Sequence, residues 1–308
     1  MSIIEAVDLT KIYRSKGRNL MALDALTLTV QPGSALGVLG PAGAGKTTLA
    51  RTMAGLTRPT TGSVTINGLP ALDQRSRLGL GYLPDHPEFP GHLTVFGALE
   101  LSGRLHCVPE HEIEGRAQAL LEDVDLGKWA GTKVRKCSSD MLRRLALASS
   151  LMSHPDLLIV DDPPQKVDRN ARNVIVRVLQ RAREKGITLV ILTRTLAHLE
   201  KLVEQVVILN RGRIIRSAPI ADLILERPQM EIEADIGETL IKLPTDLGRV
   251  VAISRKKLVV ELKQEDDINE VIDYLRLSRI HIHSVQRRKA SPDAGWQELM
   301  RQEEEVVR

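Results

Sequence analysis

The fold of this 308-residue chain is decided by the stretch Gly40-Pro41-Ala42-Gly43-Ala44-Gly45-Lys46-Thr47-Thr48. It matches the pattern G-x-x-x-x-G-K-[ST], follows the apolar run Ala35–Leu39 and opens a segment with helical character up to Ala54. Glycines let successive backbone N–H groups turn inward around an anion, and the helix N-terminus adds partial positive charge. The stretch therefore predicts a phosphate-binding loop between a buried strand and a helix.

A second segment supplies the metal chemistry that such a loop needs. Leu157–Val160 is a continuous apolar run, and Asp161 follows it directly. A carboxylate at the end of a strand can hold Mg²⁺ through oxygen. We expect Lys46 to reach the β- and γ-phosphates of a nucleotide, and the Thr47 hydroxyl and Asp161 to act as Mg²⁺ ligands.

The surrounding pattern indicates an α/β fold. Short β-prone runs bounded by turn residues precede and follow the loop, whereas residues 92–130 have helical spacing. Two continuous apolar runs are typical of parallel strands that are buried on both faces. The expected strands are Ile3–Leu9, Leu26–Val30, Ala35–Leu39, Ser63–Ile66, Leu157–Val160 and Thr188–Leu192.

The chain changes character at Pro228, so we expect two domains, 1–228 and 229–308. The second domain has the pattern of a small βαββαβ unit. Its expected elements are a strand at Met230–Ile236, a hairpin from Val250–Ile253 to Leu258–Leu262, a helix at Asp267–Leu277, a strand at Ile280–Val285 and a terminal helix at Gly295–Glu304.

The composition excludes several classes of protein. With 43% hydrophobic and 27% charged residues the chain is an ordinary globular protein, and no apolar run approaches the roughly 18 residues of a membrane span. Aromatic residues make up 2% of the chain, too few for base-stacking platforms, so we expect no nucleic acid as partner. Cys107 and Cys137 form neither a disulfide framework nor a zinc site, and the N-terminus has no signal-peptide pattern, so we expect a reducing cytoplasmic setting.

Charge is distributed unevenly along the chain. Residues 1–228 hold 30 Lys and Arg against 23 Asp and Glu, whereas residues 229–308 hold 13 against 16. A mildly basic first domain of this kind suits an ATP- or membrane-facing role. We expect Arg177, Arg181, Arg183 and Lys185 to form a solvated helix face.

From residue 3 to about 225 the sequence resembles the ATP-binding subunits of ABC transporters, most closely those of drug and polysaccharide exporters. The resemblance implies a P-loop NTPase fold with a RecA-like core, an antiparallel β subdomain and a helical subdomain at about 90–150, followed by a ferredoxin-like α+β extension. The segments that resemble the family are VDLTKIYRS, ALDALTLTVQPG, LGVLGPAGAGKTTLARTMAGLTRPTTGSVTING, LGLGYLPD, LRRLALASSLMSHPDLLIVDDP and VVILNRGRII.

The resemblance also implies ligands and partners. It implies ATP with Mg²⁺, an adenine stacked on Tyr13, phosphates on Gly40–Thr48, and Ser138 facing the nucleotide of a second ATPase subunit that pairs head to tail. A separate membrane-spanning permease would contact the segment Asp85–Leu105. The protein would then lie at the inner face of the cell membrane.

Four positions depart from the family pattern. Asp85 replaces a Gln that contacts Mg²⁺ and the attacking water, and Asp140 lies in a signature where the family has Gly. Asp162 replaces the catalytic Glu, and Arg194 replaces the switch His. Asp85 remains a suitable Mg²⁺ ligand, whereas Arg194 can donate hydrogen bonds but cannot relay a proton.

These departures leave alternatives open. The chain is a slow but ordinary ATPase, binds ATP with poor hydrolysis, or has no nucleotide role. It works as a homodimer or as one half of a heterodimer. Two other classes remain: a non-hydrolysing, ATP-gated assembly subunit of a membrane complex, and a soluble ABC ATPase outside transport.

Overall fold

The computed structural model describes residues 2–15, 18–161, 168–196, 199–223, 229–236, 241, 243–244, 247–288 and 296. The chain divides into two compact units, Met1–Ile220 and Ala221–Arg308. The boundary expected at Pro228 falls within residues 224–228, outside the described part. No helix in the described ranges has both the length and the apolar character required to cross a membrane.

A six-stranded sheet forms the centre of the first unit, in the order β10-β9-β3-β8-β7-β6. Strands β3, β6, β7, β8 and β9 are parallel, and β10 is antiparallel to β9. Every residue of β3, β7 and β8 is buried, which confirms the interpretation of these apolar runs as parallel strands. The strands are β3 (Ala35–Leu39), β6 (Leu80–Leu83), β7 (Leu157–Asp161), β8 (Thr188–Thr193), β9 (Gln205–Asn210) and β10 (Arg213–Pro219).

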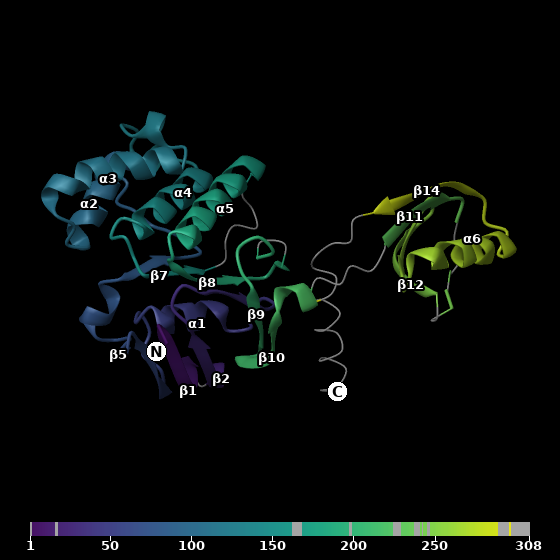
Figure 1. The fold of residues 1–308 in the computed structure, drawn as a ribbon, viewed down its shortest axis with the longest axis horizontal. Coiled ribbons are helices and arrows are strands. Elements are labelled where there is room, and N and C mark those ends of the chain that lie inside the picture. Colours follow the sequence, from purple (N-terminus) through teal and green to yellow (C-terminus); the bar gives the residue numbers. More distant parts are fainter. Residues whose placement is uncertain are drawn as a thin grey trace. The chain divides into compact units, whose positions relative to one another are not determined.

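Helix α1 (Lys46–Met53) lies between this sheet and a second, antiparallel one (Figure 1). Leu49, Ala50 and Met53 are buried in a core to which both sheets contribute. The second sheet has the order β2-β1-β4-β5, with β1 at Ile4–Ser15, β2 at Arg18–Val30, β4 at Thr61–Ile66 and β5 at Leu69–Pro70.

Strands β1 and β2 are longer than the sequence pattern predicts. Their register shifts between Ala6 and Leu9, and Asp8 and Ala25 have positive φ. Each irregularity breaks the two-residue alternation on which the strand prediction depends. The paired strands β1 and β2, called the ribbon below, therefore extend beyond the stretches that periodicity predicts.

Helices gather on the side of the sheet opposite α1 (Figure 1). They are α2 (Val95–Leu105), α3 (Glu110–Asp123), α4 (Ser139–Ser150) and α5 (Arg169–Glu184). Thr94 and Ser138 cap α2 and α4, because each hydroxyl accepts a hydrogen bond from a backbone N–H three residues on. The first three helices form the expected helical subdomain.

Arg177 and Arg181 of α5 are exposed, as expected for a solvated helix face, and they also form ion pairs at the C-terminal end of α3. Arg177 Nη2 lies 2.9 Å from Asp125 Oδ1, and Arg181 Nη1 lies 2.6 Å from Asp123 Oδ1. Arg144 of α4 donates to the Val124 carbonyl at 3.0 Å. Cations are favourable at a helix C-terminus, where unsatisfied carbonyls concentrate negative partial charge.

The second unit is a four-stranded antiparallel sheet of order β12-β13-β11-β14, with α6 (Ile268–Leu277) packed on its apolar core. This strand order is that of the expected ferredoxin-like unit. Its strands are β11 (Gln229–Ala234), β12 (Gly248–Ser254), β13 (Lys257–Leu262) and β14 (Ile282–Arg288). The expected terminal helix lies outside the described residues except for Trp296, which is helical and buried.

Gly62 provides a test of the contact between β4 and β1. Its φ is +77°, and a Cβ there would lie 2.3 Å from the Asp8 carbonyl oxygen. We expect Gly62→Ala to lower the free energy of unfolding by about 2 kcal/mol or more, because backbone strain and a clash add. Urea unfolding measures this, with Gly115→Ala in exposed helix α3 as control, where a Cβ meets nothing within 4 Å. Equal midpoints for both variants would contradict the close contact.

Tyr82 of β6 provides a test of burial beneath β7. Burial of the phenol, reinforced by the negative charge of Asp161 and opposed by Arg51, raises the pKa of Tyr82 to about 12. The unfolded value is about 10, so Tyr82 contributes stability that is complete below pH 10 and lost as pH rises through 12. Absorbance titration of phenolate should show a late phase that Tyr82→Phe removes. A late phase that survives this substitution would disprove the assignment.

Candidate functional site

The loop from Gly40 to Gly45 joins the C-terminal end of β3 to the first turn of α1. Gly45 has φ +104°, and a Cβ there would lie 2.3 Å from the Ala22 carbonyl oxygen. A Cβ on Gly40 would lie 2.3 Å from the Leu209 carbonyl oxygen. The loop thus fits against both β2 and β9 because these two positions are glycine.

Lys46 spans the loop that precedes it. The side chain is buried, and Nζ donates to the carbonyl oxygens of Gly40 and Pro41, each at 2.9 Å. These contacts place the ammonium group inside the curve of the loop. A phosphate oxygen can replace the carbonyls as acceptor with a gain in charge complementarity.

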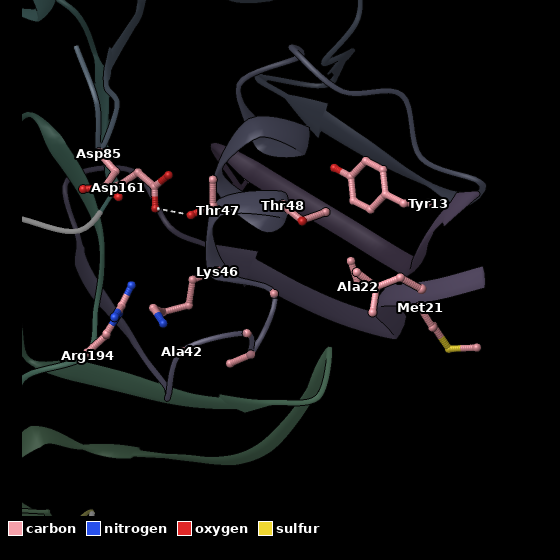
Figure 2. A pocket seen from close by; sticks show the side chains of 14 residues that line it. Tyr13, Met21, Ala22, Ala42, Lys46, Thr47, Thr48, Asp85, Asp161 and Arg194 are labelled. Atoms are coloured by element: carbon pink, nitrogen blue, oxygen red, sulfur yellow. Dashed lines mark hydrogen bonds between the residues drawn. The ribbon is translucent and has the colours of Figure 1, made fainter. Parts of the chain in front are cut away.

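Thr47 and Asp161 meet at the end of β7. Thr47 Oγ1 lies 3.2 Å from Asp161 Oδ1 and donates to it, and Asp161 is 2% exposed (Figure 2). A hydroxyl and a carboxylate oxygen at this separation form a hard donor set that fits Mg²⁺. The sequence predicted the two residues for one site, and the fold brings them together.

These residues line an open pocket of about 220 Å³. Side chains of β1 and β2 form its apolar wall, with Tyr13 paired to Leu20 and Ile12 to Met21 across the ribbon. Leu20 is 65% exposed, and Met21 is also exposed. An exposed apolar pair beside an aromatic ring suits a flat, partly apolar ligand such as a nucleobase.

Leu20 and Met21 are site residues that the sequence reasoning did not find. Both precede the β-prone run Leu26–Val30, in a stretch without clear alternation. Only the structure identifies them, because it shows that both side chains are exposed and that Leu20 is paired with Tyr13 across the ribbon. Ala42, Gly43, Ala44 and Thr48 line the pocket as expected.

Arg194 and Asp85 line the same pocket from the sheet side. Figure 2 shows the Arg194 guanidinium directed toward the space that the Lys46 ammonium also faces. Asp85 has two partners, because its Oδ1 lies 3.1 Å from Arg143 Nη2 and its Oδ2 lies 3.0 Å from His86 Nδ1. Asp162 lies outside the described residues.

The altered signature lies at the start of α4 and does not line this pocket. Ser138 Oγ accepts from the Met141 N–H at 3.2 Å and caps the helix. Asp140 Oδ2 accepts from the backbone N–H of Asp168 at 3.3 Å, and Asp168 Oδ1 in turn accepts from the Ala171 N–H at 2.8 Å. The Asp140 carboxylate therefore bonds to the loop that leads into α5 of its own chain.

A second pocket, of about 340 Å³, lies where α1, β6, α2 and α4 approach one another. We call it the groove and define it by Ala54, Leu56, Gln74, Arg77, Leu78, Leu80, Tyr82, Leu105, His106, Ser149 and Ser150. Leu56, Leu78 and Leu105 are exposed there, Leu105 by 73%. Clustered exposed leucines around a hollow are typical of a protein-binding surface.

Comparison with known proteins identifies the family. The family profile described as ABC transporter matches residues 23–165. The chain is 32% identical over 253 residues to the Nod factor export ATP-binding protein I of Rhizobium meliloti, covering 80% of this chain and 73% of that protein. It is 28% identical over 296 residues to the methionine import ATP-binding protein MetN 1 of Acinetobacter baylyi, covering 91% and 83%.

A solved structure described as the ATP-binding subunit of an ABC transporter superposes with a TM-score of 0.65 at 26% identity, over 72% of this chain and 92% of that one. The similarity extends over most of the chain. The structure also has the phosphate loop, the Thr47–Asp161 pair and the helical subdomain in their expected places. The chain belongs to the ATP-binding subunits of ABC transporters.

Proposed function

We propose that this subunit binds Mg-ATP in the pocket above α1 and hydrolyses it slowly while it drives or gates a separate membrane subunit. The observation that supports this most is that the phosphate loop matches its motif completely, whereas residues around it differ from those that the family uses. Lys46 Nζ lies inside the curve of the loop, and Thr47 Oγ1 and Asp161 Oδ1 lie 3.2 Å apart as an oxygen donor pair suited to Mg²⁺. Asp85 and Arg194, which face the same space, differ from the residues that the family uses for hydrolysis.

The pocket accounts for each part of the ligand. Adenine would stack on Tyr13 against Leu20 and Met21, and the phosphates would accept hydrogen bonds from the loop amides and Lys46. Thr47, Asp161 and Asp85 are the residues that would hold Mg²⁺. When bound, the ion neutralises charge on the phosphates.

Slow hydrolysis follows from two side chains. Arg194 stays positively charged and only donates, so it can stabilise a γ-phosphate but cannot pass on a proton. Asp162 has one methylene less than Glu, and a misplacement of about 1 Å in a catalytic group costs on the order of 100-fold in rate. Together they favour a long-lived ATP complex.

Asp140 favours pairing with a different subunit rather than with a second copy. In a head-to-tail dimer the start of α4 faces the triphosphate of the other subunit. Repulsion between unit charges 4 Å apart is about 4 kcal/mol at an effective dielectric constant of 20. The bond from Asp140 to the Asp168 N–H reduces but does not remove this charge. A partner with glycine at this position would complete the site of the present chain.

The groove supplies the contact with a membrane-spanning permease. Leu105 ends the segment Asp85–Leu105 that the sequence singled out for this contact, and Leu56 and Leu78 extend its apolar surface. A permease on this surface would hold the subunit at the inner face of the membrane.

The test of the proposed function is nucleotide retention. Purified protein incubated with Mg-ATP and rapidly desalted should retain ATP with little ADP. Lys46→Ala should remove retention, because the loop loses its ammonium group, and Asp162→Glu should raise phosphate release at least tenfold. Unaided turnover above about 1 per second, the low end of ordinary enzymes, would contradict slow hydrolysis. No retention by the wild type would contradict nucleotide binding itself.

Tyr13 tests where the base lies. Stacking of a base on an aromatic ring is worth about 1–3 kcal/mol, so Tyr13→Ala should weaken ATP binding about tenfold or more. Tyr13→Phe keeps the ring and should bind as the wild type does. Calorimetric titration with a non-hydrolysable ATP analogue measures both. Equal affinity of Tyr13→Ala and wild type would place the base elsewhere.

A further inference from the structure

Helix α4 contacts both the nucleotide pocket and the groove. Near its start Arg143 bonds to Asp85, which lines the pocket. At its end Ser149 and Ser150 line the groove. A single helix of 12 residues therefore joins the two places where nucleotide and permease are proposed to bind.

Arg143 contacts Asp85, which lies in the loop after β6, through two oxygen atoms. Arg143 Nη2 donates both to the backbone carbonyl of Asp85 and to its Oδ1. The two side chains are 17% and 31% exposed, so water screens the pair only in part. Charges in such partly desolvated pairs interact more strongly than surface pairs do.

Asp140 supplies a second bond between the same end of α4 and the core. Its bond to the Asp168 N–H fixes the first turn of α4 to the loop before α5. The first two turns of α4 thus bond to Asp85, which lines the nucleotide pocket, and to the backbone N–H of Asp168. Loss of either bond would weaken the attachment of the first turns of α4 to the core.

We propose that Arg143 is a positioning residue that competes with the divalent cation for the carboxylate of Asp85. The inference rests on the proposed function, because it assumes that Mg²⁺ enters the pocket with ATP. With no cation bound, Arg143 holds Asp85 and the β6–α2 segment against α4. With the cation bound, the Asp85 carboxylate turns to the metal, and Arg143 keeps its bond to the Asp85 carbonyl.

The charges around Asp85 support this competition. Asp161, Lys46 and Arg194 line the same pocket as Asp85, and Figure 2 shows Asp85 and Asp161 on the same side of it. A divalent cation beside Asp161 attracts a second carboxylate more strongly than a monovalent guanidinium does. When the Asp85 carboxylate is released, Arg143 still donates to the Asp85 carbonyl, and the carboxylate exchanges the guanidinium for the cation, so neither charged group loses every partner. The start of α4 would then be held less firmly, and the C-terminal end of the same helix lies at the groove.

The test measures the Mg²⁺ concentration that gives half-maximal ATP retention. Arg143→Met removes the competitor and should lower this concentration about fivefold, a usual size for coupling between sites. Arg143→Lys keeps the charge and should shift it less than twofold. Asp85→Asn should raise it, and Arg143→Met should have no effect in the Asp85→Asn background. Arg135→Met, which removes an exposed cation of the helical subdomain that has no bond to Asp85 among the described contacts, is the matched control.

A merely structural Arg143 would give a different pattern. Its loss would weaken retention at every Mg²⁺ concentration without moving the midpoint. An unchanged midpoint in Arg143→Met would therefore overturn the proposal, and so would an equal shift in the Asp85→Asn background. A shift with Arg135→Met would assign the effect to general electrostatics instead.

A nucleotide-free measurement separates this inference from the proposed function. Hydrogen exchange of the first turns of α4 should quicken when Mn²⁺ alone is added to the wild type. The same addition should leave Asp85→Asn unchanged. If the wild type retains no ATP but shows this response, the proposed function fails and the competition stands. If it retains ATP without either response, the competition fails.

Discussion

The structure depends on one steric constraint, the passage of the phosphate loop between two neighbouring backbones. Gly40 approaches the carbonyl of Leu209 on β9, and Gly45 approaches the carbonyl of Ala22 on β2. Each approach is too close for any side chain. The loop is thereby fixed to the six-stranded sheet on one side and to the ribbon on the other. The position of Tyr13 relative to Lys46, and hence the length of ligand that the pocket can accept, follows from these contacts.

Two carboxylates near the nucleotide pocket and the start of α4 have partners inside the chain. Asp85 bonds to Arg143, and Asp140 bonds to the amide of Asp168. A carboxylate near a partly buried surface requires a donor. Both donors lie where the helical subdomain meets the core. The same two carboxylates therefore contribute to the contact between the two subdomains.

Local pattern was sufficient to predict much of this molecule. Strand β3 begins and ends at the expected residues, and α1 starts directly after Gly45, because a buried strand and a phosphate loop have strong local signatures. Long-range contacts were not accessible in the same way. The pairing of Leu20 with Tyr13 depends on ribbon register, which shifts at three places. The bonds of Arg177 and Arg181 depend on where α3 ends in space, and a charge pattern along one helix does not contain that information.

Those arginine bonds give the protein a sensitivity to its ionic surroundings. The pairs of Arg177 with Asp125 and of Arg181 with Asp123 join α5 to α3 across the border between core and helical subdomain, and all four side chains are well exposed. Mobile ions weaken such pairs, since the Debye length is about 8 Å at physiological salt and shortens as salt rises. The stiffness of the border should therefore fall with rising salt, whereas the buried strands around the phosphate loop keep their rigidity. A change in ionic strength would then alter the motion of the helical subdomain without changing the phosphate loop.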